Sequence, residues 1–255
     1  KYFAGMPLGT SNDQGSGIRL GQSVGGETDH MDRVTAWRFL NPPLAFAQGM
    51  VVNQAGKRFC NEMVYGATLG DAMCENNEGK AYLVLDAALY DEAKKQASVA
   101  LPFQRDMARM LMYFNSRKKS TIGDLAKIYG IPEGDLSASL EEYNQSAQNK
   151  MPCKFGKAAE DVKELKGPFY IMDISIDSKL APLTTLTLGG LKVNEETGEV
   201  LNLEGKEIRG LYAAGRTAVG ICSNIYVSGL SIADCIFSGR RIGQNLDIKE
   251  VNNGI

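Results

Sequence analysis

The chain has 255 residues, and its 28 Lys and Arg against 30 Asp and Glu leave a net charge of −2, so neither nucleic acid nor an anionic membrane surface is an expected partner. A single histidine, His30, argues against sites built on several imidazoles, and five cysteines without a CxxC pair predict neither a metal centre nor a disulfide framework. Free thiols favour a reducing, cytoplasmic compartment. No apolar run approaches the roughly 20 residues of a membrane-spanning helix.

The first part of the sequence predicts short elements between turns. A polar, Gly-rich loop and a short helix are expected within residues 9–26. Apolar runs bounded by Pro, Gly or Asn predict a strand at 34–40, a β-hairpin at 49–62 and a short apolar strand at 81–86. Asp86 is expected to cap the helix that follows this strand.

The middle of the sequence predicts helices, and the last third returns to β structure. Pro102 is expected to open one helix, and Thr121 and Asp135 are expected to cap two more. From Phe169 onward, short apolar strands alternate with turns until a final helix at 230–242. The pattern indicates Gly-rich, β-dominated ends around a more helical middle.

An ordered series of motifs carries the most specific signal. The chain reads NDQGSGIRLGQSVGG at 12–26, GMVVNQAGKRFCNE at 49–62, PFY at 168–170, TLGGLKVN at 187–194 and IRGLYAAGR at 208–216. A Gly- and Ser-rich loop and a helix follow the last of these. Each motif alone is weak, but in this order they resemble the FAD-dependent fumarate reductase and 3-ketosteroid dehydrogenase family.

The resemblance implies an α+β fold in which a substrate-capping domain interrupts a flavin-binding domain. Residues 1–45 and 183–255 are then parts of the FAD-binding domain, and residues 46–182 form the capping domain. The strand and GxGxxG turn that hold the FAD pyrophosphate in such folds do not occur in this sequence. We therefore interpret the chain as a fragment that binds FAD weakly or not at all, and whose exposed strand edges favour a homodimer.

The resemblance also implies which residues contact FAD. Asp13 matches a position that touches the cofactor, and the small residues that end at Gly215 let the flavin ring approach the backbone. The amides of Ser231 and Ile232 open a helix whose positive end favours a reduced, anionic flavin. Arg216 is a departure, because fumarate reductases usually carry Glu at this position.

The substrate loop departs from the fumarate reductases. Their His and Arg in this loop fall on Cys222 and Tyr226, and a further His falls on Leu186. Without these cations the two carboxylates of fumarate would be buried unpaired, which is costly. The sequence therefore disfavours a dicarboxylate substrate.

The loop SNIYVSGLS instead resembles that of ketosteroid dehydrogenases which oxidise the ring bond on the C4 side of the 3-keto group. This resemblance makes Tyr226 and Ser228 the polar pair beside the substrate, and Tyr65 a second tyrosine offered by the capping domain. The amide of Gly229 becomes a second donor to the keto oxygen. Packing or helix capping is the competing interpretation for each of these side chains.

Three functions remain open from the sequence. The first is an FAD-dependent oxidoreductase that transfers hydride between flavin and a CH–CH bond beside the ketone of a small, apolar, 3-ketosteroid-like molecule. The second is a related flavoprotein that reduces another enoate or enone. The third is a folded fragment without activity of its own. No metal is expected in any of them.

Overall fold

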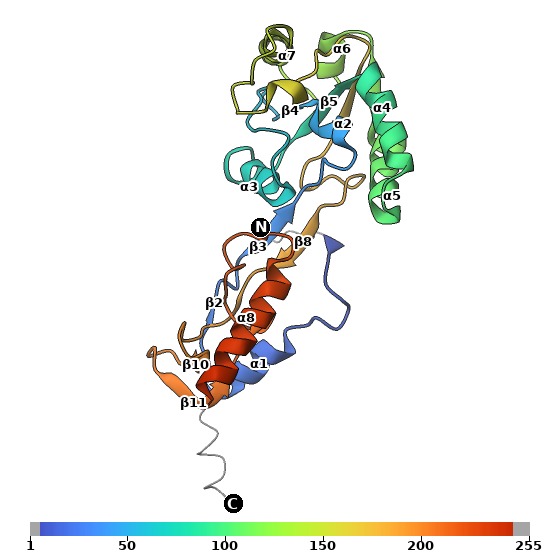
Figure 1. Ribbon diagram of the computed structural model, residues 1–255. Helices are drawn as coiled ribbons and strands as arrows, with labels where there is room; N and C mark the ends of the chain where they lie inside the picture. Colours follow the sequence, from blue (N-terminus) through green and yellow to red (C-terminus); the bar gives the residue numbers. More distant parts are fainter. Residues whose placement is uncertain (1–5, 247–255) are drawn as a thin grey trace, which may run out of the picture. The chain divides into compact units, whose positions relative to one another are not determined.

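The computed structural model describes residues 6–246, which form two compact units (Figure 1). The large unit contains Ala36–Thr184 together with Met6, and the small unit contains Pro7–Thr35 and the chain from Thr185 onward. Helices and strands occur in both units, which confirms the predicted α+β class. The domain limits inferred from the resemblance, at residues 45/46 and 182/183, stay predictions.

An antiparallel sheet forms the centre of the large unit, with the strand order β4–β5–β7–β6. These strands are β4 (Met50–Val52), β5 (Tyr82–Asp86), β6 (Arg117–Lys119) and β7 (Phe169–Asp173). Every residue of β5 is buried, because this strand lies between two others and helix α4 packs against it. The apolar run at 81–86 therefore forms the predicted strand, and the structure places it inside the sheet between β4 and β7.

Helices surround this sheet, and three of the expected starting signals are confirmed. The helices are α2 (Leu44–Ala47), α3 (Gly66–Asn76), α4 (Ala87–Ser98), α5 (Pro102–Met110), α6 (Ile122–Ala126) and α7 (Glu133–Gln148). Asp86 accepts a hydrogen bond from the Leu89 N–H at 2.8 Å and caps α4. Thr121 caps α6 in the same way, and Pro102 opens α5. α4 and α5 pack side by side (Figure 1).

Asp135 does not cap α7, so this prediction is wrong. A cap at Asp135 would start the helix at Leu136, but the helix begins three residues earlier, at Glu133, directly after Pro132. Pro132 takes the N-cap position itself, with φ of −58° and ψ of 118°, and no side chain caps the helix there. Asp135 lies in the first turn instead, where its negative charge favours the positive end of the helix.

The expected hairpin at 49–62 forms only in part. The turn closes through the Asn53 N–H and the Lys57 carbonyl, and a single bridge joins Val52 to Arg58. Beyond this bridge the second strand is absent, because the Val51 N–H donates to the Glu62 carboxylate at 3.0 Å rather than to a neighbouring strand. The buried Glu62 side chain thus takes the place of the backbone hydrogen bonds that a second strand would make.

Glu62 belongs to a buried ionic cluster that joins distant parts of the large unit. Arg58 donates to both carboxylate oxygens, at 3.0 and 2.9 Å, and Lys157 donates to one of them at 3.3 Å. Lys157 also donates to the Gly49 carbonyl and the Tyr143 hydroxyl. Burial lowers the pKa of the Lys157 ammonium, because water no longer stabilises its charge.

The small unit is built from short strands and two longer helices. Its elements are α1 (Ser16–Ser23), β2 (Thr28–Asp29), β9 (Gly190–Leu191), β10 (Glu199–Leu201), β11 (Glu207–Tyr212), a 3₁₀ turn (Gly215–Thr217) and α8 (Leu230–Asn245). The strands β1 (Met6–Pro7), β3 (Val34–Trp37) and β8 (Thr184–Thr187) contain the points where the chain passes between the units. β2 pairs with β9 and β10 pairs with β11, both antiparallel.

The core of the small unit is modest and depends on a close approach of α1 to β9. Leu191 and Val200 are its largest fully buried side chains. A side chain at Gly21 of α1 would collide with Leu191, so glycine is needed at this crossing. In contrast, α8 buries only Asp234 and Ser238 among its described residues.

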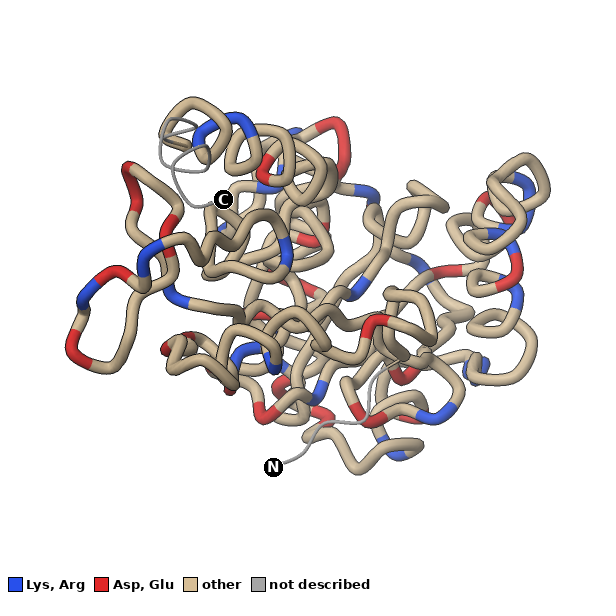
Figure 2. Tube along the Cα trace, turned by 90° about the horizontal axis from the view of Figure 1, so that it is seen from below, with Lys and Arg blue, Asp and Glu red and all other residues tan. Residues whose placement is uncertain are grey.

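The distribution of charged residues agrees with the net charge of −2. Figure 2 shows that positive and negative residues are interspersed along the trace. In the described part of the chain, no helix is long and apolar enough to cross a membrane.

Candidate flavin site

The small unit contains a cavity of about 690 Å³, which we call the small-unit cavity. Its walls come from the loop before α1, the first turn of α1, strand β8, the 3₁₀ turn and the start of α8. Three of the five residues predicted to contact FAD lie on these walls, namely Asp13, Arg216 and Ser231. Tyr226, predicted as catalytic, lies on the same walls.

The first wall is the loop that leads into α1. Asp13 is held in it by its own carboxylate, which accepts the Thr10 N–H at 2.8 Å. Gly15 takes a left-handed conformation, with φ of 70°, and no side chain caps the helix that follows. The first amides of α1 therefore keep unsatisfied donors and a partial positive charge at the cavity.

A second wall is the start of α8. Gly229 precedes the helix with φ of 89°, and again no side chain caps it. Ser231 lines the cavity, whereas the Ile232 side chain is 69% exposed and does not. The predicted role of Ile232 through its backbone amide stays a prediction.

Gly215 fixes the 3₁₀ turn against α8. Its N–H donates to the Ser238 hydroxyl at 2.8 Å, and a side chain at Gly215 would come within 2.6 Å of the Cys235 sulfur. Gly215 also has a positive φ of 57°, which disfavours other residues. Gly215 itself does not line the cavity but places the next residue there.

That next residue is Arg216, whose Nη2 donates to the carbonyl of Thr187 on β8. It is the one cation on the cavity wall in the described part of the chain. The guanidinium therefore joins the turn to β8 and leaves a positive charge at the cavity.

The loop that carries Tyr226 is held at several points. The Gly220 N–H donates to the Ser223 hydroxyl at 2.9 Å, and Arg33 donates to the Asn224 side-chain oxygen at 2.5 Å. No local motif in the sequence connects Arg33 to this loop, because its acceptor Asn224 lies 191 residues away. Ser228 is exposed and does not line the cavity.

Cys222 begins this loop and is fully buried. Burial is the main cause that raises the pKa of its thiol. It is therefore a packing residue with a neutral thiol rather than a nucleophile. No cluster of three or more His, Cys, Asp or Glu side chains suited to a metal occurs among residues 6–246.

Tyr65 belongs to the large unit. It immediately precedes α3, and its ring centre lies 5.7 Å from that of Trp37. The predicted cooperation of Tyr65 with Tyr226, which belongs to the small unit, stays a prediction.

The residues of the small-unit cavity suit a flavin. Its volume falls within the roughly 300–1,000 Å³ of small-molecule sites. The two uncapped helix starts and Arg216 offer donors and positive charge to polar ring atoms, and Asp13 offers an acceptor. Asn12, Gln14, Thr187 and Thr217 also line the cavity and were not singled out by the sequence.

Comparison with known proteins decides the family. A family model described as an FAD binding domain matches residues 17–229. The chain belongs to this family. FAD is accordingly its cofactor, and the resemblance carried by the ordered motifs is confirmed.

The relatives are steroid dehydrogenases and reductases. The chain is 41% identical over 218 residues to a 3-oxo-5-alpha-steroid 4-dehydrogenase of Comamonas testosteroni, which covers 84% of this chain and 41% of that protein. It is 29% identical over 239 residues to a probable fumarate reductase of Shewanella frigidimarina, covering 91% and 38%. The chain thus spans less than half the length of either relative.

A solved structure agrees with these relatives. It is a 3-ketosteroid-delta4-(5alpha)-dehydrogenase from Rhodococcus jostii RHA1 in complex with 4-androstene-3,17-dione. The match has a TM-score of 0.75 and 30% sequence identity, and it covers 91% of this chain and 45% of that chain. The chain therefore has the fold of this part of an FAD-dependent oxidoreductase.

Proposed function

We propose that the chain is part of an FAD-dependent dehydrogenase that oxidises the CH–CH bond beside the ketone of a 3-ketosteroid-like molecule. The observation that carries this proposal is Tyr226 on the wall of the small-unit cavity, within the loop SNIYVSGLS. The identity of 41% to a 3-oxo-5-alpha-steroid 4-dehydrogenase supports the same substrate class. The proposed partner is therefore a small, apolar ketone.

The residues divide the reaction between them. FAD, when bound, accepts a hydride from the substrate. Tyr226 takes up the proton from the carbon next to the ketone, which its phenol oxygen can do as a general base once it has lost its own proton. The amide of Gly229 and the hydroxyl of Ser228 hold the keto oxygen, where negative charge develops. The substrate thus loses one hydride and one proton and gains a C=C double bond.

The charge of the cavity favours this direction of electron flow. Arg216 and the two uncapped helix starts would hold the cofactor and would stabilise negative charge on its reduced form. These are contacts to the cofactor. They leave the substrate with neutral donors, which suits a ketone better than a carboxylate.

Reduction of an enone or enoate is the second candidate. Further relatives include an NADH:acrylate oxidoreductase at 27% identity and a urocanate reductase at 24%. The cavity wall argues against an acidic substrate. Arg216 is the one cation on it among the described residues, and its guanidinium already donates to the Thr187 carbonyl. Leu186 also lines this wall, at the position where the resemblance places a histidine.

Anaerobic flavin reduction tests the two directions. The FAD-loaded full-length protein is mixed with a saturated 3-ketosteroid, and separately the reduced full-length protein is mixed with fumarate or with a 4-ene-3-ketosteroid. We expect the saturated steroid to bleach the flavin band and fumarate to leave reduced flavin unchanged. Rapid reoxidation by fumarate, with no response to any steroid, would contradict the proposed substrate class. No response to either class would favour the inactive fragment.

We also propose that this chain on its own forms a homodimer. Ile232, Ile236 and Phe237 of α8 are 69%, 67% and 57% exposed, and apolar surface of this kind favours association. Sedimentation velocity of the wild type should show a dimer that Ile236→Glu weakens. Exposed Glu196→Gln is the matched surface control. A wild type that stays monomeric at high concentration would contradict self-association.

A further inference from the structure

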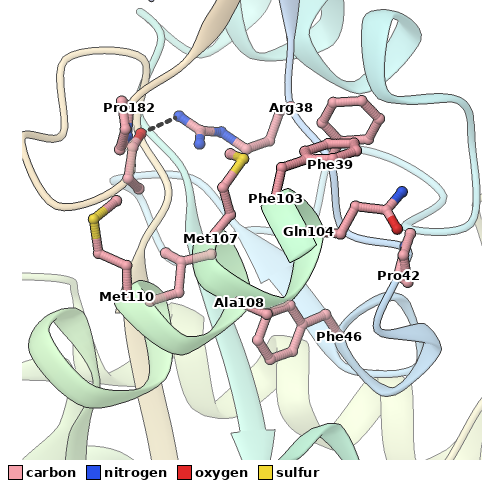
Figure 3. Close-up of a pocket in the computed structure, with 12 residues that line it drawn as sticks. Arg38, Phe39, Pro42, Phe46, Phe103, Gln104, Met107, Ala108, Met110 and Pro182 are labelled. Atoms are coloured by element: carbon pink, nitrogen blue, oxygen red, sulfur yellow. Dashed lines mark hydrogen bonds between the residues drawn. The ribbon is translucent and has the colours of Figure 1, made fainter. Parts of the chain in front are cut away.

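The large unit has a small pocket beneath α5 that the flavin site does not use (Figure 3). Its volume is about 20 Å³, enough for one small head group. The walls are almost entirely apolar, with aromatic, methionine and proline side chains from α5 and from the segments that enter and leave the unit. They include Phe39, Pro42, Phe46, Met107, Met110 and Pro182.

A buried cation lies at this apolar pocket. Arg38 is only 2% exposed, and its Nη2 donates to the carbonyls of Ser175 at 3.0 Å and Ala181 at 2.9 Å. Its Nε is buried without a hydrogen-bond partner. Figure 3 shows the guanidinium above Met107 and its hydrogen bond to the Ala181 carbonyl, next to Pro182.

The charge of Arg38 lacks a contacting carboxylate in the described part of the chain. Asp173 is the acid that acts on it electrostatically, but this carboxylate accepts the Ser175 N–H at 2.9 Å and forms no ion pair with Arg38. Burial lowers the pKa of Arg38 to about 10, so the guanidinium stays charged at neutral pH. A buried cation with an unmet donor is costly unless an anion reaches it.

The mouth of the pocket offers apolar surface. Phe103, on the first turn of α5, lines the pocket and is 55% exposed, and the neighbouring Leu101 is 61% exposed. A carboxylate can fill the small volume beside Arg38 while the apolar body attached to it lies along these side chains. The planar fork of a guanidinium matches a carboxylate in shape and charge.

We propose that this pocket binds the carboxylate end of an apolar molecule, with Arg38 facing the head group and Phe103 covering the chain. This ligand differs from the neutral ketone assigned to the small unit. Its binding needs neither FAD nor turnover.

Isothermal titration of the full chain with decanoate tests this inference, with decanamide as the neutral ligand of the same length. We expect saturable binding of one decanoate and binding of decanamide at least tenfold weaker. Arg38→Met should remove the preference for the acid. Arg105→Met is the matched control on α5, because Arg105 pairs with Asp106 and does not line the pocket.

A second variant protects the test against misfolding, because Arg38 also joins two loop carbonyls. Met107→Trp fills the pocket and keeps Arg38 and both of its hydrogen bonds. Circular dichroism should match the wild type, and decanoate binding should fall at least tenfold. Equal binding of decanoate and decanamide, or unchanged binding in a folded Met107→Trp variant, would overturn the inference.

Discussion

The hydroxyl of Ser238 accepts the Gly215 N–H at 2.8 Å and donates to the Asp234 carbonyl at 2.5 Å. The middle of α8 therefore fixes the turn that places Arg216 on the wall of the small-unit cavity. Ser238 is itself buried and does not line this cavity. It is a positioning residue for the flavin site.

Ser238→Ala should destabilise the small unit and weaken the flavin site. The change leaves the buried Gly215 N–H without its acceptor, which costs about 1–3 kcal/mol. Urea unfolding measures this loss, and exposed Ser98→Ala at the end of α4 is the control. A variant as stable as the control would show that Gly215 finds another partner.

In the full-length protein, Arg216→Met should weaken FAD binding about 10- to 150-fold, because a hydrogen bond to a charged group contributes about 1.5–3 kcal/mol. The long apolar side chain keeps most of the volume but removes the charge. Titration followed by flavin fluorescence measures the dissociation constant, with exposed Arg240→Met on α8 as the control. Equal affinities of the two variants would remove Arg216 from the cofactor site.

The local elements could be predicted from the sequence because their signals are local. Asp86 caps the helix that begins at the next residue, and the buried run at 81–86 needs only its own pattern to be read as a strand. The start of α7 was misplaced because Asp135 and Pro132 are both starting signals, and the proline prevails. Such competition is decided by backbone geometry rather than by composition.

The site could be predicted only where motifs carry it. Asp13, Arg216, Tyr226 and Ser231 were expected from the resemblance and line one cavity. Hydrogen bonds between distant residues could not be predicted from the sequence. Arg33 donates to an acceptor 191 residues away, and Lys157 donates to the Gly49 carbonyl 108 residues away. These contacts depend on tertiary packing that a single sequence does not display.

Glu62→Gln should destabilise the large unit by about 3–5 kcal/mol, because it leaves the buried Arg58 and Lys157 without their carboxylate. Urea unfolding followed by circular dichroism measures the change. Glu204→Gln is the control, since its ion pair with Lys206 is exposed and surface pairs contribute about 0–1 kcal/mol. Equal effects of the two changes would show that the cluster is electrostatically unimportant.

Alkaline pH should destabilise the large unit through Tyr82. Burial is the main cause that raises the pKa of its phenol from 10.0 to about 12, and the hydroxyl donates to the Gln54 side-chain oxygen at 2.6 Å. The folded state keeps this proton after the unfolded chain has lost it, so the stability contribution falls as pH rises from about 10 to about 12.

Unfolding measured across this range should therefore depend less steeply on pH in Tyr82→Phe than in the wild type. Tyr113→Phe, which changes an exposed tyrosine, is the control and should keep the wild-type slope. Identical slopes in all three proteins would show that Tyr82 ionises equally in the folded and unfolded states.

Single-turnover reduction of the flavin in the Tyr226→Phe variant of the full-length protein tests the proposed dehydrogenase most directly. The change keeps the ring and its packing but removes the hydroxyl that we assign to the proton beside the ketone. Flavin content should hold, steroid affinity should fall little, and the reduction rate should fall by about two to four orders of magnitude. A reduction rate within a factor of a few of the wild type, at equal flavin content, would contradict the catalytic role of Tyr226.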